Sequence, residues 1–128
     1  MIIAGIDFSM TSPAICVHKN SSENWSINNC TFYYIVSKNK HIVKTDKLKG
    51  YLYKEYASQE ERFENLSEWT TNILTQEEVD FIGLEGYSYG SSSSRIFQIG
   101  ENTGLLKYFL WKRKFDFEVY APTVIKKY

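Results

Sequence analysis

Short hydrophobic runs in the first third of the chain are separated by polar turns, a pattern typical of β-strands. Residues 2–6 form an apolar run that ends at Asp7, as expected of a buried central strand. Residues 8–13 have the composition of a turn, and residues 14–18 are predicted to return as the second strand of a hairpin. Residues 31–36 are rich in β-branched and aromatic side chains, which favours a third strand.

The segment that follows has no clear hydrophobic period. Ile42 and Val43 could extend the sheet, but residues 44–56 are basic and rich in tyrosine, with Gly50 in the middle. We therefore interpret residues 44–56 as a loop or a short excursion from the sheet.

The clearest helix in the sequence begins after Ser58. Serine is a good N-cap, and Glu61 stands three residues later, which is the spacing of a capping box. Hydrophobic residues and one threonine then recur at helical spacing and define a single face. The residues of this face are Phe63, Leu66, Thr70, Ile73 and Leu74.

The last third of the chain alternates strands with helices. Residues 80–85 form a short apolar strand that ends in a glutamate, and a loop of glycine, serine and tyrosine follows. A helix is predicted over residues 95–111 and a strand over residues 117–120, and Pro122 is typical of the first turn of a third helix. This order predicts one α/β domain, residues 1–128, with a mixed five-stranded sheet (three antiparallel strands, then βα units) flanked by helices.

Charge and cysteine content narrow the function classes. The 15 basic and 15 acidic residues give a net charge of zero, so binding to nucleic acid must depend on local patches. Cys16 and Cys30 are too few and too far apart for a metal knuckle or a redox motif, so we expect buried free thiols. No signal peptide or membrane-spanning stretch is recognisable, and we expect a cytosolic protein. The abundance of Lys, Asn, Tyr and Ile suggests an AT-rich genome.

Asp7 and Glu85 are the main candidates for chemistry because each ends an apolar strand. Open α/β sheets bind ligands at the carboxyl ends of their strands. If the two strands are neighbours, the carboxylates come close together and repel each other unless a cation neutralises them. Their oxygen atoms suit Mg²⁺ or Mn²⁺, which could activate water and stabilise charge on a phosphate. Either acid alone could simply cap a turn, but together they favour a metal site.

Several basic, hydroxyl and aromatic side chains are candidates for contact with nucleic acid. The lysines and tyrosines of residues 38–56 suit a DNA backbone and its bases, or else a solvated sheet edge that resists aggregation. The serine-rich loop could bind phosphate or be merely flexible, and the basic end of the second helix could bind DNA or complement the helix dipole. The candidates are Ser9, Lys47, Lys49, Tyr51, Ser92, Ser93, Arg95, Lys112 and Arg113.

Gly100 and Gly104 stand one turn apart inside the second predicted helix. Because glycine costs about 1 kcal/mol relative to alanine inside a helix, we expect a close contact to offset that cost. Glycine would allow the helix to approach either the sheet or the helix of a second subunit.

The two acids lie within short motifs whose order and spacing are shared by a known family. Residues 5–9, GIDFS, place an Asp at the end of the first strand before a small polar turn. Residues 83–87, GLEGY, place a Glu at the end of a later strand, and residues 91–106 and 119–127 match the following segments. In these features the chain resembles the RuvC-like Holliday-junction resolvases of the RNase H-like superfamily.

The resemblance implies an RNase H-like fold and a homodimeric endodeoxyribonuclease that resolves branched DNA by two-metal phosphodiester hydrolysis with Mg²⁺ or Mn²⁺. Resemblance to so compact a member of the family also implies a bacterial or phage source. Asp7 and Glu85 match the first two acids of that family. One or two further ligands belong to the family's last helix, which would continue past Tyr128, so no residue is matched to them. We therefore expect the domain to be incomplete at its C-terminus and to lack part of the active site.

Three alternatives stay open on the sequence. The chain could be a non-catalytic relative that binds nucleic acid or protein, or half of a split enzyme whose site a second chain completes. It could also be an ATPase-type relative of the same broad fold. Against this last alternative, Phe8 and Ser9 stand where the phosphate loop of those proteins normally supplies a glycine.

Overall fold

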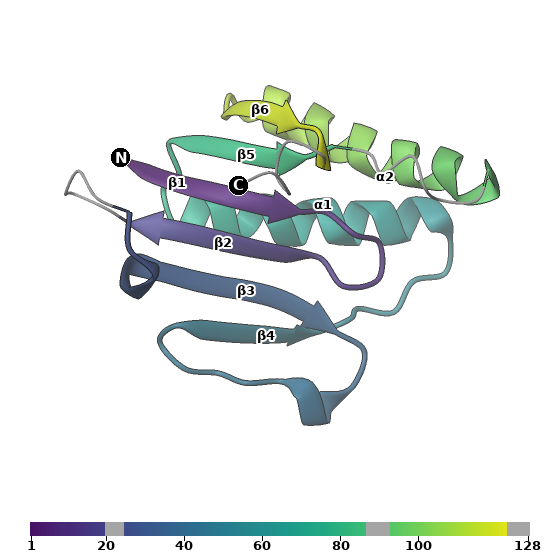
Figure 1. Ribbon diagram of the computed structural model, residues 1–128. Helices are drawn as coiled ribbons and strands as arrows, with labels where there is room; N and C mark the ends of the chain where they lie inside the picture. The colour runs from purple at the N-terminus through teal and green to yellow at the C-terminus, as the bar shows by residue number, and fades with distance from the viewer. Residues whose placement is uncertain (20–24, 87–92, 123–128) are drawn as a thin grey trace.

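A computed structural model describes residues 1–19, 25–86 and 93–122, which form one sheet and two long helices (Figure 1). The strands are β1 (Ile2–Asp7), β2 (Ala14–Lys19), β3 (Cys30–Val36), β4 (Leu48–Leu52), β5 (Phe81–Glu85) and β6 (Asp116–Tyr120). The helices are α1 (Gln59–Gln76) and α2 (Ser93–Lys112), with 3-10 turns at Ile27–Asn29 and Asn39–His41. None of the described helices is long and apolar enough to span a membrane. The predicted third helix lies outside the described residues beyond Pro122.

The six strands lie in the order β4-β3-β2-β1-β5-β6. β1, β2 and β3 pair antiparallel, whereas β5 and β6 join β1 in parallel register. Figure 1 shows both helices behind the sheet, so one of its faces carries α1 and α2 and the other is free of them. The predicted mixed α/β sheet, with antiparallel strands followed by βα units, is confirmed.

The sheet has one strand more than the five that the sequence predicts. Leu48–Leu52, which we interpreted as loop, is β4 and pairs parallel with β3. Gly50 makes this possible, because a Cβ atom there would lie 2.7 Å from the ring of Tyr34. The Tyr34 hydroxyl donates to the carbonyl of His41 at 3.2 Å and accepts from the amide of Val43 at 3.0 Å. These contacts fold the preceding loop against β4. They join residues of different segments, so no hydrophobic periodicity within residues 44–56 indicates the strand.

Helix α1 begins as its sequence predicts. The Ser58 hydroxyl accepts a hydrogen bond from the amide of Glu61 at 3.1 Å. The Glu61 carboxylate accepts from the amide of Ala57 at 3.3 Å, one residue before the position of a standard capping box. The predicted apolar face of α1 is buried in full, as Phe63, Leu66, Thr70, Ile73 and Leu74 all lie in the interior.

The hydrophobic core fills the space between the sheet and the two helices. Strand residues alternate between that core and the face that α1 and α2 leave uncovered, as the two-residue period of a strand requires. In β1, Ala4 and Ile6 are buried while Asp7 is exposed, and in β5, Leu84 is buried while Glu85 is half-buried. Both acids therefore belong to the side of the sheet that α1 and α2 leave uncovered.

Helix α2 does not use its two glycines to approach the sheet. A Cβ atom built on Gly100 or Gly104 would meet no atom within 4 Å in the part of the chain that the structure describes. The expectation of a close contact with the sheet is therefore wrong, because these positions lie on the outer side of the helix. Phe97 and Trp111 on the same helix are 74% and 70% exposed.

A buried polar cluster joins β2, β3 and the end of α1. The Tyr33 hydroxyl donates to Glu77, whose other carboxylate oxygen lies 2.5 Å from the ammonium nitrogen of Lys19. Burial raises the pKa of Glu77, but the hydrogen bonds from Lys19 and Tyr33 outweigh it and leave that pKa below its usual value. Burial and the Glu77 charge raise the pKa of Tyr33, so its hydroxyl keeps its proton.

Both cysteines are free thiols, as the sequence predicts. Cys30 is buried and Cys16 is half-buried. Burial and the neighbouring Cys30 raise the pKa of Cys16 to about 12, which suppresses the reactive thiolate at neutral pH.

Candidate active site

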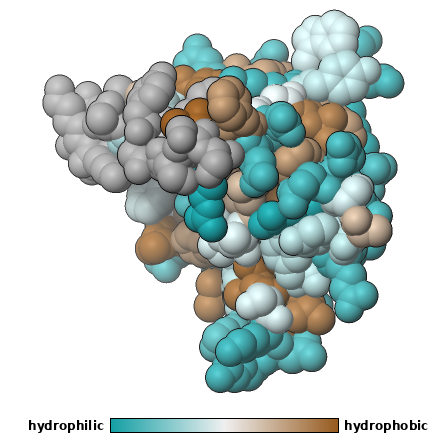
Figure 2. Space-filling view, turned by 90° about the vertical axis from the view of Figure 1, so that its right-hand side faces the viewer, coloured by the Kyte–Doolittle hydropathy of each residue, from teal (hydrophilic) through white to brown (hydrophobic). Residues whose placement is uncertain are grey.

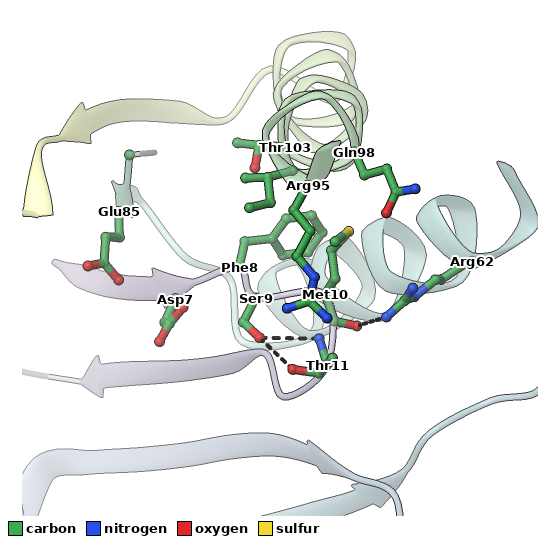
Figure 3. Close-up of a pocket in the computed structure, with 12 residues that line it drawn as sticks. Asp7, Phe8, Ser9, Met10, Thr11, Arg62, Glu85, Arg95, Gln98 and Thr103 are labelled. Atoms are coloured by element: carbon green, nitrogen blue, oxygen red, sulfur yellow. Dashed lines mark hydrogen bonds between the residues drawn. The ribbon is translucent and has the colours of Figure 1, made fainter. Parts of the chain in front are cut away.

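Asp7 and Glu85 lie side by side at the carboxyl ends of β1 and β5. The two strands are parallel neighbours in which Ile6 is aligned with Leu84, so the next residue of each strand is one of the two acids. Figure 3 shows their carboxylate groups close to one another at one end of a hollow. The acids were expected to lie close together if their strands were neighbours, and β1 and β5 are neighbours in the sheet.

The hollow has a volume of about 310 Å³ and lies where β1 runs into the β1–β2 turn (Figure 3). Figure 2 views the molecule from the side at which these strand ends lie, and hydrophilic and hydrophobic side chains are interspersed there. The hollow is lined by Asp7, Phe8, Ser9, Met10, Thr11, Arg62, Glu85, Gly86, Arg95, Gln98, Ile99 and Thr103.

Ser9 shapes the turn beside the acids. Its hydroxyl oxygen accepts hydrogen bonds from the amides of Thr11 at 3.2 Å and Ser12 at 3.0 Å. The serine oxygen thus serves as the hydrogen-bond acceptor for two backbone amides of the turn, which is a common role of serine in loops. The Ser9 hydroxyl proton remains available to a partner such as Thr11 Oγ1, 3.3 Å away, or to a ligand in the hollow.

Arg95 comes to the same hollow from the first turns of α2. Its side chain is exposed and makes no hydrogen bond or ion pair with any other described residue. Of the other loop candidates, Ser92 lies outside the described residues, and for Ser93 only the backbone, at the start of α2, is described.

Arg62 also lines the hollow, although sequence reasoning did not single it out. Its Nε donates to the Tyr53 hydroxyl at 2.8 Å and its Nη2 to the carbonyl of Met10 at 3.0 Å. It stands at the end of the first turn of α1, next to the capping signal and outside the apolar face. The sequence offers no local sign of this role, because Met10 is 52 residues away along the chain.

The candidates Lys47, Lys49 and Tyr51, at the other edge of the sheet, do not line the hollow. β4 is separated from β1 by β3 and β2. The Lys49 ammonium nitrogen lies 5.6 Å from the ring centre of Tyr33, and Tyr51 packs edge-on against Trp69 at 5.9 Å. Lys47 donates to the carbonyl of Asn28. These candidates make contacts within the protein instead of joining the acids.

Lys112 and Arg113 are also remote from the acids. They lie at the end of α2, roughly 25 Å along the helix from Arg95 by the usual rise per residue. The Lys112 ammonium nitrogen lies 5.7 Å from the ring centre of Tyr108, and the Arg113 guanidinium carbon lies 5.7 Å from that of Phe109. The structure thus brings Asp7, Ser9, Glu85 and Arg95 together and leaves the remaining described candidates elsewhere.

Within the described ranges, no group of three or more His, Cys, Asp or Glu side chains is placed to hold a metal ion. The carboxylates of Asp7 and Glu85 are therefore a pair, with hard oxygen atoms of the kind that Mg²⁺ and Mn²⁺ prefer. His18 does not add to the pair, since its Nε2 accepts from the amide of Ser26 at 3.2 Å.

Comparison with solved structures identifies the fold. The structure of Thermus thermophilus RuvC in complex with a Holliday junction substrate aligns with a TM-score of 0.66 and 12% identity, over 99% of this chain and 68% of that one. This chain has a RuvC-type, RNase H-like fold. A second Thermus thermophilus RuvC structure aligns with a TM-score of 0.61 and 15% identity, over 95% of this chain and 64% of that one. No protein-family model and no curated protein matches the sequence.

Proposed function

We propose that this chain is the nuclease domain of an enzyme that cleaves branched DNA at phosphodiester bonds, with Asp7 and Glu85 at its centre. The observation that carries the proposal is the placement of both carboxylates at neighbouring strand ends, on the rim of a hollow, in a RuvC-type fold. A protein of that fold has been solved with a Holliday junction, and four-way DNA is therefore the first substrate to test.

The donor set suits a divalent cation. Two adjacent carboxylates gain from a cation that relieves their repulsion, and Mg²⁺ and Mn²⁺ accept such oxygen ligands. When bound, the cation would activate a water molecule and stabilise the negative charge that develops on the phosphate. A pair of metal ions would need ligands besides Asp7 and Glu85, from residues outside the described ranges or from a second chain.

The remaining side chains of the hollow would position the DNA backbone. The Ser9 hydroxyl can donate one hydrogen bond to a phosphate oxygen, and the exposed Arg95 can donate several. Because neither is engaged with a carboxylate of a described residue, their donors are free to recognise phosphate. In the absence of the cation, the acids themselves repel phosphate, so cation binding and DNA binding should reinforce each other.

We also propose a homodimer whose two copies meet through the outer side of α2. Phe97 and Trp111 are far more exposed than aromatic side chains usually are, and Gly100 and Gly104 leave open space between them. A second α2 helix can approach closely where side chains are absent. Sedimentation at increasing protein concentration should show dimers, and Gly104→Arg should shift the equilibrium to monomers. A monomer at all concentrations would overturn this part of the proposal.

The nuclease proposal is tested by two measurements on the same protein preparations. Calorimetric titration with Mn²⁺ should show binding that Asp7→Asn and Glu85→Gln each weaken. Incubation of a labelled four-way junction with Mg²⁺ should give nicked products that neither variant forms. If the protein binds the junction but neither binds Mn²⁺ nor cleaves, the non-catalytic or split-enzyme alternative replaces the proposal.

A further inference from the structure

We propose that Arg62, held in place by Tyr53 and Tyr56, binds a non-scissile phosphate of the nucleic-acid backbone in the hollow, together with Arg95. The inference rests on the proposed function, since it assigns a backbone-binding subsite beside the same acids. It adds a residue that neither the motifs nor the fold identifies.

The guanidinium of Arg62 is fixed before any ligand arrives. Its carbon lies 5.8 Å from the ring centre of Tyr53 and 5.2 Å from that of Tyr56, and two of its N–H groups donate to Tyr53 and Met10. A side chain already ordered in this way loses little conformational entropy when it binds a ligand. Preorganisation of this kind lowers the cost of binding a ligand at the wall of the hollow.

Arg62 keeps both its charge and most of its donors. A guanidinium has five N–H donors, and the two internal hydrogen bonds leave the others unassigned. Its partners among the described residues are a hydroxyl, a carbonyl and two aromatic rings, none of which neutralises a positive charge. The planar fork of arginine matches the oxygen atoms of a phosphate, which makes an anion of this kind the fitting ligand.

The acidic and basic side chains of the hollow lie at opposite sides of it, an arrangement that suits successive phosphates of a nucleic-acid strand. Figure 3 shows Asp7 and Glu85 on one side and the guanidinium groups of Arg95 and Arg62 on the other, with Ser9 between them. A phosphate at the acids requires a cation, whereas a phosphate at the arginines does not. One backbone strand can thus place its reacting phosphate at the acids and a neighbouring phosphate at Arg62 and Arg95.

A purely structural role for Arg62 must be distinguished from phosphate binding. Arg62 and the Tyr53 hydroxyl both donate to the carbonyl of Met10, at 3.0 Å and 2.5 Å, and so tie the β1–β2 turn to α1. Tyr53→Phe removes the hydroxyl from this network but leaves the positive charge in place. Arg62→Gln removes the charge, and Arg62→Lys retains it without the planar fork.

The experiment measures binding of a fluorescent four-way junction by anisotropy, in EDTA, over a series of NaCl concentrations. Each phosphate contact contributes about 0.9 to the slope of log affinity against log salt. We expect Arg62→Gln to reduce that slope by about one contact and the affinity by roughly tenfold. Arg62→Lys should keep the slope with reduced affinity, and Tyr53→Phe should keep the slope. Lys40→Gln removes the same charge from an exposed site beyond β3 and should change neither quantity.

The possible outcomes separate this inference from the proposed function. An unchanged slope in Arg62→Gln, or an equal change in Lys40→Gln, overturns the phosphate contact while leaving the nuclease proposal intact. A reduced slope in Arg62→Gln together with Mn²⁺ binding that ignores Asp7 supports the contact and overturns the metal site. An unmodified protein that binds neither the junction nor a linear duplex overturns both.

Discussion

Two regions of the sheet contain charged residues beside aromatic rings, and only one has the features of a binding site. At the β3–β4 edge, Tyr33, Glu77 and Lys19 are bonded to one another, and Lys49 lies over the Tyr33 ring. At the ends of β1 and β5, Asp7 and Glu85 face a hollow, and no described cation forms a salt bridge with them. Both regions combine acidic, basic and aromatic residues, so residue type does not distinguish them. What distinguishes the structural cluster from the candidate site is whether each charged group has a partner within the protein.

The largest expected effect comes from the acids at the hollow. Asp7→Asn removes one of two adjacent carboxylates, and we expect Mn²⁺ affinity to fall by more than about a hundredfold, beyond what the loss of an indirect partner causes. Calorimetry measures this change. Asp46→Asn alters the same chemical group at an exposed position just before β4 and should leave Mn²⁺ binding unchanged. Equal losses in the two variants would remove the distinction between the regions.

Tyr33→Phe should affect stability and not Mn²⁺ binding. The substitution deletes the hydroxyl that donates to the buried carboxylate of Glu77 but keeps the ring in the core. A hydrogen bond to a charged group contributes about 1.5–3 kcal/mol, and we expect a loss of that size in the free energy of unfolding. Urea denaturation measures it, and an unchanged midpoint would show that the cluster contributes nothing to stability.

The same cluster predicts how stability depends on acidity. Because the folded protein holds the pKa of Glu77 below its usual value, the carboxylate stabilises the fold above the unfolded-state pKa. This contribution is lost as the pH falls through the lowered folded-state pKa. Glu77→Gln should therefore be less stable than the unmodified protein at pH 7, with a difference that narrows on acidification. Thermal melts of both proteins over a series of pH values measure this difference. A difference in stability that stays constant over the series would contradict a lowered pKa for Glu77.

The smallest expected effect concerns DNA binding by Lys49. Since its ammonium group already lies over Tyr33 and near Glu77, we expect Lys49→Gln to reduce junction affinity less than about twofold and to leave the salt slope unchanged. Anisotropy against a salt series measures both quantities. A slope reduced by about 0.9, the contribution of one phosphate contact, would place DNA at the β3–β4 edge and make the basic segment a candidate binding surface again.

The parts of the fold that were predictable depend on local patterns. The run that ends at Asp7, the cap at Ser58 and the apolar face of α1 each follow from residues within a few positions of one another. The strand β4 was missed because lysine and glycine interrupt its hydrophobic pattern, and Gly50 is required only by the ring of Tyr34 in the neighbouring strand.

The candidate site was predictable to the same limited extent. The strand-end acids carry a signal in the sequence, whereas Arg62 acquires its place only through Met10 and Tyr53, which lie far from it along the chain. Similarly, Lys49 and Tyr51 match the composition of a nucleic-acid surface, but the fold engages them in contacts with Tyr33 and Trp69. The roles of Arg62, Lys49 and Tyr51 therefore depend on packing between segments that are far apart in the sequence.

The central position of β1 has a consequence for synthesis of the protein. β1 is synthesised before its parallel partner β5, which ends 78 residues after Asp7, where Glu85 completes the pair of acids. Contacts of such long sequence separation form slowly, because bringing the two strands together costs the entropy of closing a long loop. A nascent chain that has not yet reached Glu85 therefore has one acid without the other. The two carboxylates of the proposed cation site can come together only after α1 has been synthesised.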